Sequence, residues 1–169
     1  MGKKGSLKNY IILLCIMLFT VICVFYILNL YKQYNDEKLK TSVISSVLSE
    51  VKYDDLSSIV KERDFLVVYM CSSSELKCRN FESKFKDYLV KNDLTTDTVY
   101  LSLGYSGDND NYISRIYNDY KSDTLMKKLN NYPSILIFSN GEIIDLFSPN
   151  KDSSNTIALA KEFLSGYVS

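Results

Sequence analysis

Two short apolar runs decide the fold of this chain, and they read Phe65-Leu66-Val67-Val68-Tyr69-Met70-Cys71 and Tyr132-Pro133-Ser134-Ile135-Leu136-Ile137-Phe138. Both runs are rich in β-branched and aromatic residues, and both have the length of a buried strand. Asn140-Gly141 follows the second run and is the strongest short signal for a β-hairpin. Glu142–Phe147 would supply the return strand of that hairpin. The sequence therefore predicts a central sheet that pairs a strand near the start of residues 64–145 with two strands near their end.

Helical patterns separate the predicted strands. Asp54-Asp55 would begin a helix that ends near Arg63, and Ser72-x-x-Glu75 fits a capping box for a second helix. The apolar face of that second helix is expected to comprise Leu76, Cys78, Phe81, Phe85, Tyr88 and Leu89. The remaining elements would be short strands at 51–53 and 98–103 and helices at 111–120, 123–130 and after Ser153. This order predicts an α/β domain with a mixed sheet of four or five strands flanked by helices.

Composition and charge exclude several classes of function. The net charge is zero, but residues 1–40 carry about +4 and residues 41–169 about −4. An acidic domain lacks the basic face of a nucleic-acid binder. The chain has no histidine, the commonest general base and metal ligand. A zinc site would need all four cysteines, two of which, Cys15 and Cys23, lie in a distant apolar segment. We therefore expect no metal, no cofactor and no nucleic-acid partner.

The amino terminus has the pattern of a membrane anchor. Lys8 and Lys32 bracket 23 residues without a charge, and as a helix the apolar residues among them would span roughly 30 Å, the thickness of the hydrocarbon core. A cleaved signal peptide would have a shorter apolar region and would end in small residues, whereas this one ends Leu28-Asn29-Leu30-Tyr31. We predict a basic tail at 1–8, a transmembrane helix at 9–31, a stalk helix at 32–50 and a folded domain at 51–169.

The orientation of this anchor follows from weaker signals. Lysines flank both ends of the apolar segment in nearly equal number, so the positive-inside rule gives little guidance. A short amino-terminal tail followed by a large domain favours a tail inside the cell and a domain outside. The sequence thus predicts a single-pass protein of the cell membrane whose domain is extracytoplasmic.

Residues 71–81 and 132–145 together resemble the thioredoxin-like superfamily, and most closely its small bacterial branch that includes bacteriocin-transport accessory proteins. In that branch a strand leads to Cys-x-x-Cys, followed by a basic residue and a phenylalanine. The matching segment here reads Glu75-Leu76-Lys77-Cys78, followed by Arg79-Asn80-Phe81. The resemblance implies a thioredoxin-like fold over residues 50–168. It also implies that Tyr132-Pro133 is the family's cis-proline and that Asn140-Gly141 forms the hairpin after it.

The chain departs from this family at the first cysteine of the motif, which is replaced by Glu75. Thioredoxin chemistry needs a thiolate at a helix amino terminus and a second thiol that resolves the mixed disulfide. Cys71, seven residues before Cys78, is a candidate for the missing thiol, because cysteines that flank a short loop often pair in an oxidising compartment. Three alternatives remain open: a structural disulfide or unusual redox pair, two inert buried thiols, or Cys78 as a single reactive thiol.

Two functions are compatible with these residues. The first is a redox-inactive accessory or binding module that presents a groove formed by Pro133, Tyr132 and Glu75 to an exported protein or to a partner in a membrane complex. The second is an extracytoplasmic thiol–disulfide oxidoreductase with Cys71 and Cys78 as its catalytic residues. The loss of the first cysteine favours the binding module, since glutamate cannot attack a disulfide.

Overall fold

The computed structural model describes residues 4–103, 109–120, 129, 131–149 and 155–167. The chain divides into two compact units, Met1–Lys38 and Leu39–Ser169. The first unit comprises most of helix α1 (Lys4–Lys40), and the second is an α/β domain. The helix predicted at 123–130 and most of the loop predicted at 104–111 lie outside the described residues.

Helix α1 contains the predicted transmembrane segment. Within it, Lys8–Glu37 is long and apolar enough to cross a membrane, judged by length and composition. The large apolar side chains between Tyr10 and Tyr31 are exposed. A helix that is apolar on all sides and not buried in protein has the character of a membrane span. The structure therefore contains a candidate transmembrane helix at the predicted place.

The prediction of one stalk helix over residues 32–50 is wrong in its second half. Helix α1 ends at Lys40 and is followed by a 3₁₀ turn, η1 (Ile44–Ser46), and by strand β1 (Ser49–Val51). The apolar residues Ile44 and Leu48, whose spacing suggested a helix, are buried in the core of the domain. Contacts with residues distant in the sequence thus prevail over local helical periodicity.

The domain is built on a mixed five-stranded sheet, as predicted. Its strand order is β1-β3-β2-β4-β5, in which β2 is Phe65–Cys71, β3 is Thr98–Ser102, β4 is Ser134–Ser139 and β5 is Glu142–Phe147. Strand β2 lies in the centre, parallel to β3 and antiparallel to β4. Strand β4 begins two residues later than expected, consistent with the inability of Pro133 to donate to the ladder. This is the thioredoxin-like architecture that the sequence resembles.

The turn between β4 and β5 confirms the predicted hairpin. Asn140 and Gly141 have φ angles of 50° and 87°, so both central residues adopt the left-handed region. A type I′ turn requires this conformation, and its twist matches that of the two flanking strands. Glycine tolerates it without steric cost, and asparagine is among the few other residues that adopt it readily.

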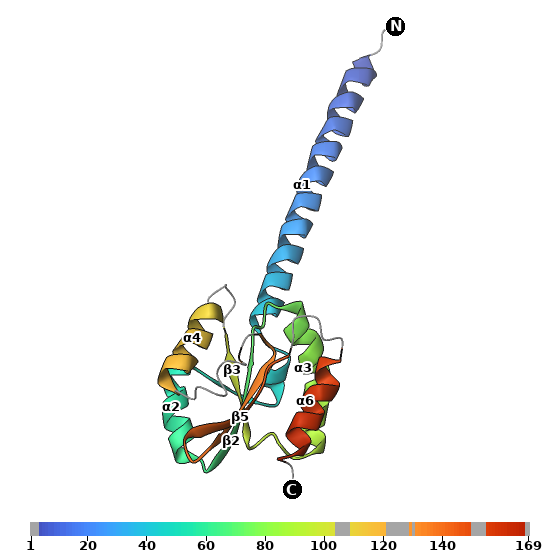
Figure 1. Ribbon diagram of the computed structural model, residues 1–169. Helices are drawn as coiled ribbons and strands as arrows, with labels where there is room; N and C mark the ends of the chain where they lie inside the picture. Colours follow the sequence, from blue (N-terminus) through green and yellow to red (C-terminus); the bar gives the residue numbers. More distant parts are fainter. Residues whose placement is uncertain (1–3, 104–108, 121–128, 130, 150–154, 168–169) are drawn as a thin grey trace. The chain divides into compact units, whose positions relative to one another are not determined.

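Helices cover both faces of the sheet, with α3 (Leu76–Lys91) and α6 (Thr156–Ser165) on one face and α2 (Tyr53–Glu62) and α4 (Asn109–Asp119) on the other (Figure 1). Asp54 and Asp55 lie in the first turn of α2, whose N-cap is Lys52. Because successive side chains of a strand point to opposite faces, β2 contributes to both cores. One core, with α2 and α4, receives Leu66, Val68 and Met70, and the other, with α3 and α6, receives Val67, Tyr69 and Cys71.

A buried carboxylate lies in the α3–α6 core. Glu82 on α3 has no exposed surface. Its Oε2 accepts hydrogen bonds from Ser42 Oγ at 2.6 Å and from the backbone N–H of Val43 at 2.8 Å, and more distantly from that of Ile44. Its Oε1 accepts one from the hydroxyl of Tyr69 at 3.3 Å. Burial, and then the charge of Glu82, raise the pKa of Tyr69 well above its ordinary value. The carboxylate is therefore stabilised by several donors at once.

Replacement of Glu82 tests this role. Glu82→Leu removes the acceptor and leaves buried donors unpaired, so we expect a loss of about 3 kcal/mol in the free energy of unfolding. The measurement is urea unfolding of the full chain in detergent, followed by near-ultraviolet circular dichroism. Glu62→Leu, at an exposed position at the end of α2, serves as the control and should change the free energy by less than about 0.5 kcal/mol. Equal losses for both variants would contradict this account.

Candidate functional site

The two cysteines of the domain form a disulfide. Cys71 ends β2 and Cys78 lies in the first turn of α3, and their Cα atoms are 5.8 Å apart. The pairing depends on the alternation of β2, which directs Cys71 to the face that α3 covers. Of the three arrangements that the sequence left open, the structure therefore has the bonded pair rather than free thiols.

Both halves of this disulfide are buried. The exposed fraction of Cys71 is 0%, and that of Cys78 is also 0%. The backbone N–H of Ser72 donates a hydrogen bond to Cys78 Sγ at 3.3 Å, while the hydroxyl of Tyr100 and the N–H of Leu103 donate to the carbonyl of Cys71. Thiol–disulfide exchange requires a thiolate to reach one of the sulfurs. In this conformation neither cysteine offers a surface for such an attack.

Glu75 is the residue that the sequence resemblance aligns with the attacking cysteine of a thioredoxin-like protein. It is the N-cap of α3, so the predicted capping box, in which Ser72 would be the N-cap, is absent, and the backbone N–H of Ser72 donates to Cys78 Sγ. The hydroxyl of Ser72 instead shares a hydrogen bond with that of Ser74. The carboxylate of Glu75 accepts a 3.4 Å hydrogen bond from the hydroxyl of Tyr132. Glu75 thus contacts the segment that precedes β4.

Two of the three predicted groove residues, Glu75 and Tyr132, contact each other, and the third, Pro133, directly follows Tyr132 in the sequence. Glu75 and Tyr132 are half-buried, whereas Pro133 is buried. The Tyr132-Pro133 peptide bond is cis, as the family resemblance implied. Next to Glu75, the side chain of Leu76 is 70% exposed. We refer to Glu75, Leu76 and Tyr132 as the loop rim.

The exposure of Leu76 corrects the predicted apolar face of α3. At 100° per residue, Leu76 lies about 160° from Cys78 and about 180° from Phe85 around the helix axis. The buried face of α3 consists of Cys78, Phe81, Glu82, Phe85 and Leu89. Helical geometry alone therefore excludes Leu76 from this face. The same helical spacing places Glu82 on the buried face of α3. This spacing was the sequence signal that could have predicted a buried carboxylate.

Arg79 is a further residue that sequence reasoning missed. Its Nη1 donates to the carbonyl of Thr41 at 3.0 Å and to that of Ser73 at 3.4 Å. Ser73 belongs to the loop closed by the disulfide, and Thr41 directly follows helix α1. One guanidinium thus links the cysteine loop to the start of the domain. The basic residue after the cysteine motif was noted as part of the family resemblance, but its partners are backbone atoms that a sequence pattern does not reveal.

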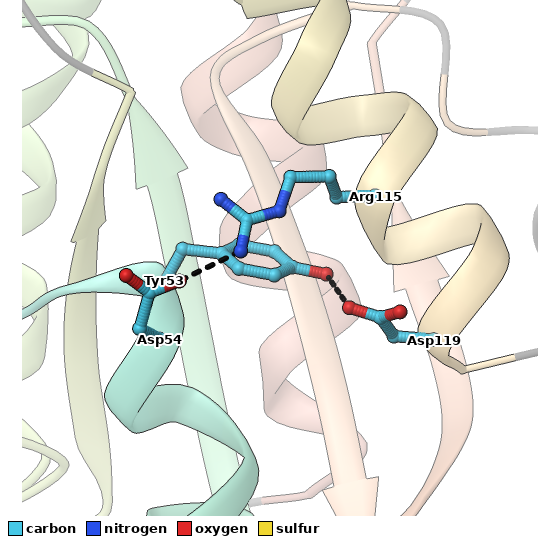
Figure 2. Close-up of polar contacts among 4 residues, drawn as sticks. All are labelled: Tyr53, Asp54, Arg115 and Asp119. Carbon is cyan, nitrogen blue, oxygen red and sulfur yellow. Dashed lines mark hydrogen bonds and ion pairs between the residues drawn. The ribbon is translucent and has the colours of Figure 1, made fainter.

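A second polar cluster lies on the opposite side of the sheet, between α2 and α4 (Figure 2). The guanidinium of Arg115 stacks over the ring of Tyr53 at 4.0 Å and forms a 2.7 Å ion pair with Asp54. The hydroxyl of Tyr53 donates to Asp119 at 2.8 Å. Burial, followed by the bond to Asp119, raises the pKa of Tyr53. These residues border a cavity of about 420 Å³. Their contacts satisfy one another, and the cluster joins α4 to α2.

Comparison with known proteins extends to the fold alone. No protein-family model matches the chain, and no curated protein matches it. Among solved structures, it is similar to thioredoxin from Fasciola hepatica (15% identity, 70% of this chain and 98% of that chain, TM-score 0.49). It is also similar to thioredoxin from Plasmodium falciparum (12%, 71% and 99%, 0.47) and to mitochondrial thioredoxin 3 from Saccharomyces cerevisiae in its oxidised form (13%, 71% and 96%, 0.46). The predicted closeness to bacteriocin-transport accessory proteins stays a prediction.

Thiol counting tests the state of the four cysteines. The full chain, denatured without reductant, is expected to react with two equivalents of a thiol reagent, at Cys15 and Cys23, and with four equivalents after reduction. Mass spectrometry of peptides alkylated before and after reduction provides the measurement. Four reactive thiols without reductant would contradict the bonded pair.

The disulfide should also stabilise the domain. Because it closes a short loop, Cys71→Ala/Cys78→Ala should lower the free energy of unfolding, measured by the same urea unfolding, by about 2 to 3 kcal/mol.

Proposed function

We propose that this chain is a membrane-anchored thioredoxin-like binding module in which the redox motif has become a structural crosslink. The observation that carries the proposal is the burial of both Cys71 and Cys78, together with Glu75 at the position of the attacking sulfur. A redox enzyme of this fold needs a reactive sulfur at the surface, and the residue available there is a carboxylate.

The loop rim is the proposed binding surface. Leu76 exposes an apolar side chain, and Tyr132 and Glu75 beside it offer a hydroxyl and a carboxylate. An exposed apolar side chain next to polar groups that can fix orientation is suited to binding a segment of another protein. Pro133 directly follows Tyr132 and is buried. It would therefore support the loop rim from inside the domain rather than contact the partner.

The location proposed for this module is the cell membrane, with the domain on the extracytoplasmic side. The apolar part of α1 supports anchoring through its length and composition. An intact disulfide is consistent with an oxidising compartment outside the cytoplasm. The partner would be an exported protein or a component of a membrane complex, as the sequence suggested.

A thiol–disulfide oxidoreductase that uses Cys71 and Cys78 is the second candidate. The observation in its favour is the hydrogen bond from the N–H of Ser72 to Cys78 Sγ, because a donor at this place would also stabilise a thiolate. Such an enzyme would have to open the loop between the two cysteines to expose a sulfur. The two candidates therefore differ in whether the cysteines are required for activity.

A reductase assay separates the two candidates. We expect the full chain in detergent to accelerate the reduction of insulin by dithiothreitol no more than its Cys71→Ala/Cys78→Ala variant does, because the sulfurs are inaccessible. The rate of insulin precipitation is the measurement, and a thioredoxin serves as the positive control. An acceleration that disappears in the double variant would establish the oxidoreductase instead.

Cellular complementation tests the loop rim. In a deletion strain of the source organism, Leu76→Glu should behave as the deletion, because it places a charge in the middle of the proposed binding surface. Val90→Glu, at a 52% exposed position near the other end of α3, is the matched control and should complement fully. Both variants must be present in the membrane at wild-type levels. Complementation by Leu76→Glu would remove the rim from consideration as a binding surface.

A further inference from the structure

The segment that follows helix α1 is part of the domain and is held against α3. We call residues Thr41–Ser46 the strap. Glu82 accepts hydrogen bonds from Ser42 and from the backbone of Val43, and Ile44 is fully buried in the core that α3 shares. Arg79, one turn earlier on α3, donates to the carbonyl of Thr41. Several buried or half-buried contacts thus fix the strap to the first half of this helix.

The strap and the cysteine loop meet at Arg79. Its Nη1 contacts the carbonyl of Thr41 at 3.0 Å and the carbonyl of Ser73 at 3.4 Å. These two backbone positions, 32 residues apart in the chain, therefore lie within two hydrogen-bond lengths of each other. Ser73 is two residues from Glu75, where the loop rim begins. The chain consequently enters the domain at the same end that carries the rim.

The length of chain before the strap limits how far the rim can lie from the membrane. Thr41 lies ten positions after Tyr31, the last residue of the predicted transmembrane segment. Helix α1 continues through Lys40, so this connection spans roughly 15 Å at 1.5 Å per residue. The few residues between Ser73 and Leu76 add roughly 10 Å at most. The step from the Thr41 carbonyl to the Ser73 carbonyl across Arg79 adds up to about 6 Å, so these connections restrict the rim to within roughly 30 Å of the bilayer surface, whatever the angle between helix and domain.

We propose that the loop rim binds an extended segment of a protein that is itself held at the membrane, close to the point where that protein leaves the bilayer. This proposal rests on the proposed function of the rim as a binding surface. A partner anchored in the same bilayer reaches a high effective concentration at the rim. A freely diffusing protein gains nothing from the short connection between the membrane and the domain. Lipid itself is a poorer occupant, because the rim presents a single leucine beside the carboxylate of Glu75.

The first experiment measures the distance that the inference requires. The full chain with Cys15→Ser, Cys23→Ser and Asn80→Cys carries a donor fluorophore at residue 80, an exposed position next to Arg79. It is reconstituted in vesicles of phosphatidylcholine and phosphatidylglycerol (7:3) that contain an acceptor-labelled lipid. The comparison is a variant with about twenty Gly and Ser residues inserted between Lys40 and Thr41, a flexible linker long enough to release the domain. Energy transfer should fall at least twofold on insertion, and equal transfer would overturn the inference.

The second experiment identifies the occupant. A photocrosslinking amino acid replaces Leu76, and the reconstituted chain is irradiated with a library of twelve-residue peptides, either coupled to lipid in the same vesicles or free in solution at equal total concentration. We expect at least tenfold more adduct with the lipid-coupled library, and we expect this advantage to disappear with the inserted linker. The same crosslinker in place of Val90 is the matched control and should give little adduct.

The outcomes distinguish this inference from the function on which it rests. Equal adduct with free and coupled peptides would overturn the inference and leave the rim as a binding surface. Adducts with lipid alone would overturn the inference in favour of a lipid contact. Absence of any peptide adduct, while energy transfer confirms the short distance, would overturn both the inference and the proposed function of the rim.

Discussion

The covalent bond between the end of β2 and the first turn of α3 is the constraint on which the site depends. It is possible because side chains alternate along β2, so that Cys71 points into the same core as Val67 and Tyr69. A shift of one residue in the register of β2 would turn Cys71 to the face covered by α2 and α4 and separate it from Cys78. The bond therefore depends on the packing of the whole sheet, and in return it holds the amino terminus of α3 against the strand.

This arrangement differs in one physical respect from a working redox site. Exchange chemistry needs one sulfur that is exposed and another that waits behind it. Here both sulfurs lie inside the domain, and the half-buried Glu75, which the sequence resemblance aligns with the attacking cysteine, contacts Tyr132 through its carboxylate. The Tyr132-Pro133 peptide bond is cis. The loop rim, with the exposed side chain of Leu76, is the surface that we propose for binding.

Two polar side chains of α3, the buried Glu82 and the half-buried Arg79, connect this site to the start of the domain. Glu82 is surrounded by donors from Ser42, Val43 and Tyr69, and Arg79 joins the carbonyls of Thr41 and Ser73. A buried carboxylate without such donors would be costly, so the strap and α3 stabilise each other. Ser42 and Ile44, which closely follow helix α1, are therefore buried parts of the domain.

Much of the fold was predictable from local pattern. The bounds of β2, the Asn140-Gly141 hairpin, the α/β order of elements and the apolar helix near the amino terminus all follow from periodicity and turn chemistry over a few residues. The replacement of the first motif cysteine by Glu75 stays a prediction from the sequence resemblance. The exposure of Leu76 and the burial of Glu82 could have been read from the helical angles of α3, but the apolar character of leucine and the charge of glutamate suggested the opposite.

Only the tertiary structure decided which alternative holds for the cysteines, where α1 ends and what Glu82 and Arg79 contact. The end of α1 and the contacts of Glu82 and Arg79 depend on pairs of residues far apart in the chain, such as Ser42 with Glu82 and Thr41 with Arg79. Local periodicity continued the helix through Ile44 and Leu48, whereas the folded domain buries both residues, and a carboxylate from α3 accepts a hydrogen bond from the backbone N–H of Val43. The sequence by itself determines which segments can become strands and helices. The polar contacts between those segments form only when the domain folds. Their energy determines where α1 ends and what Glu82 and Arg79 contact.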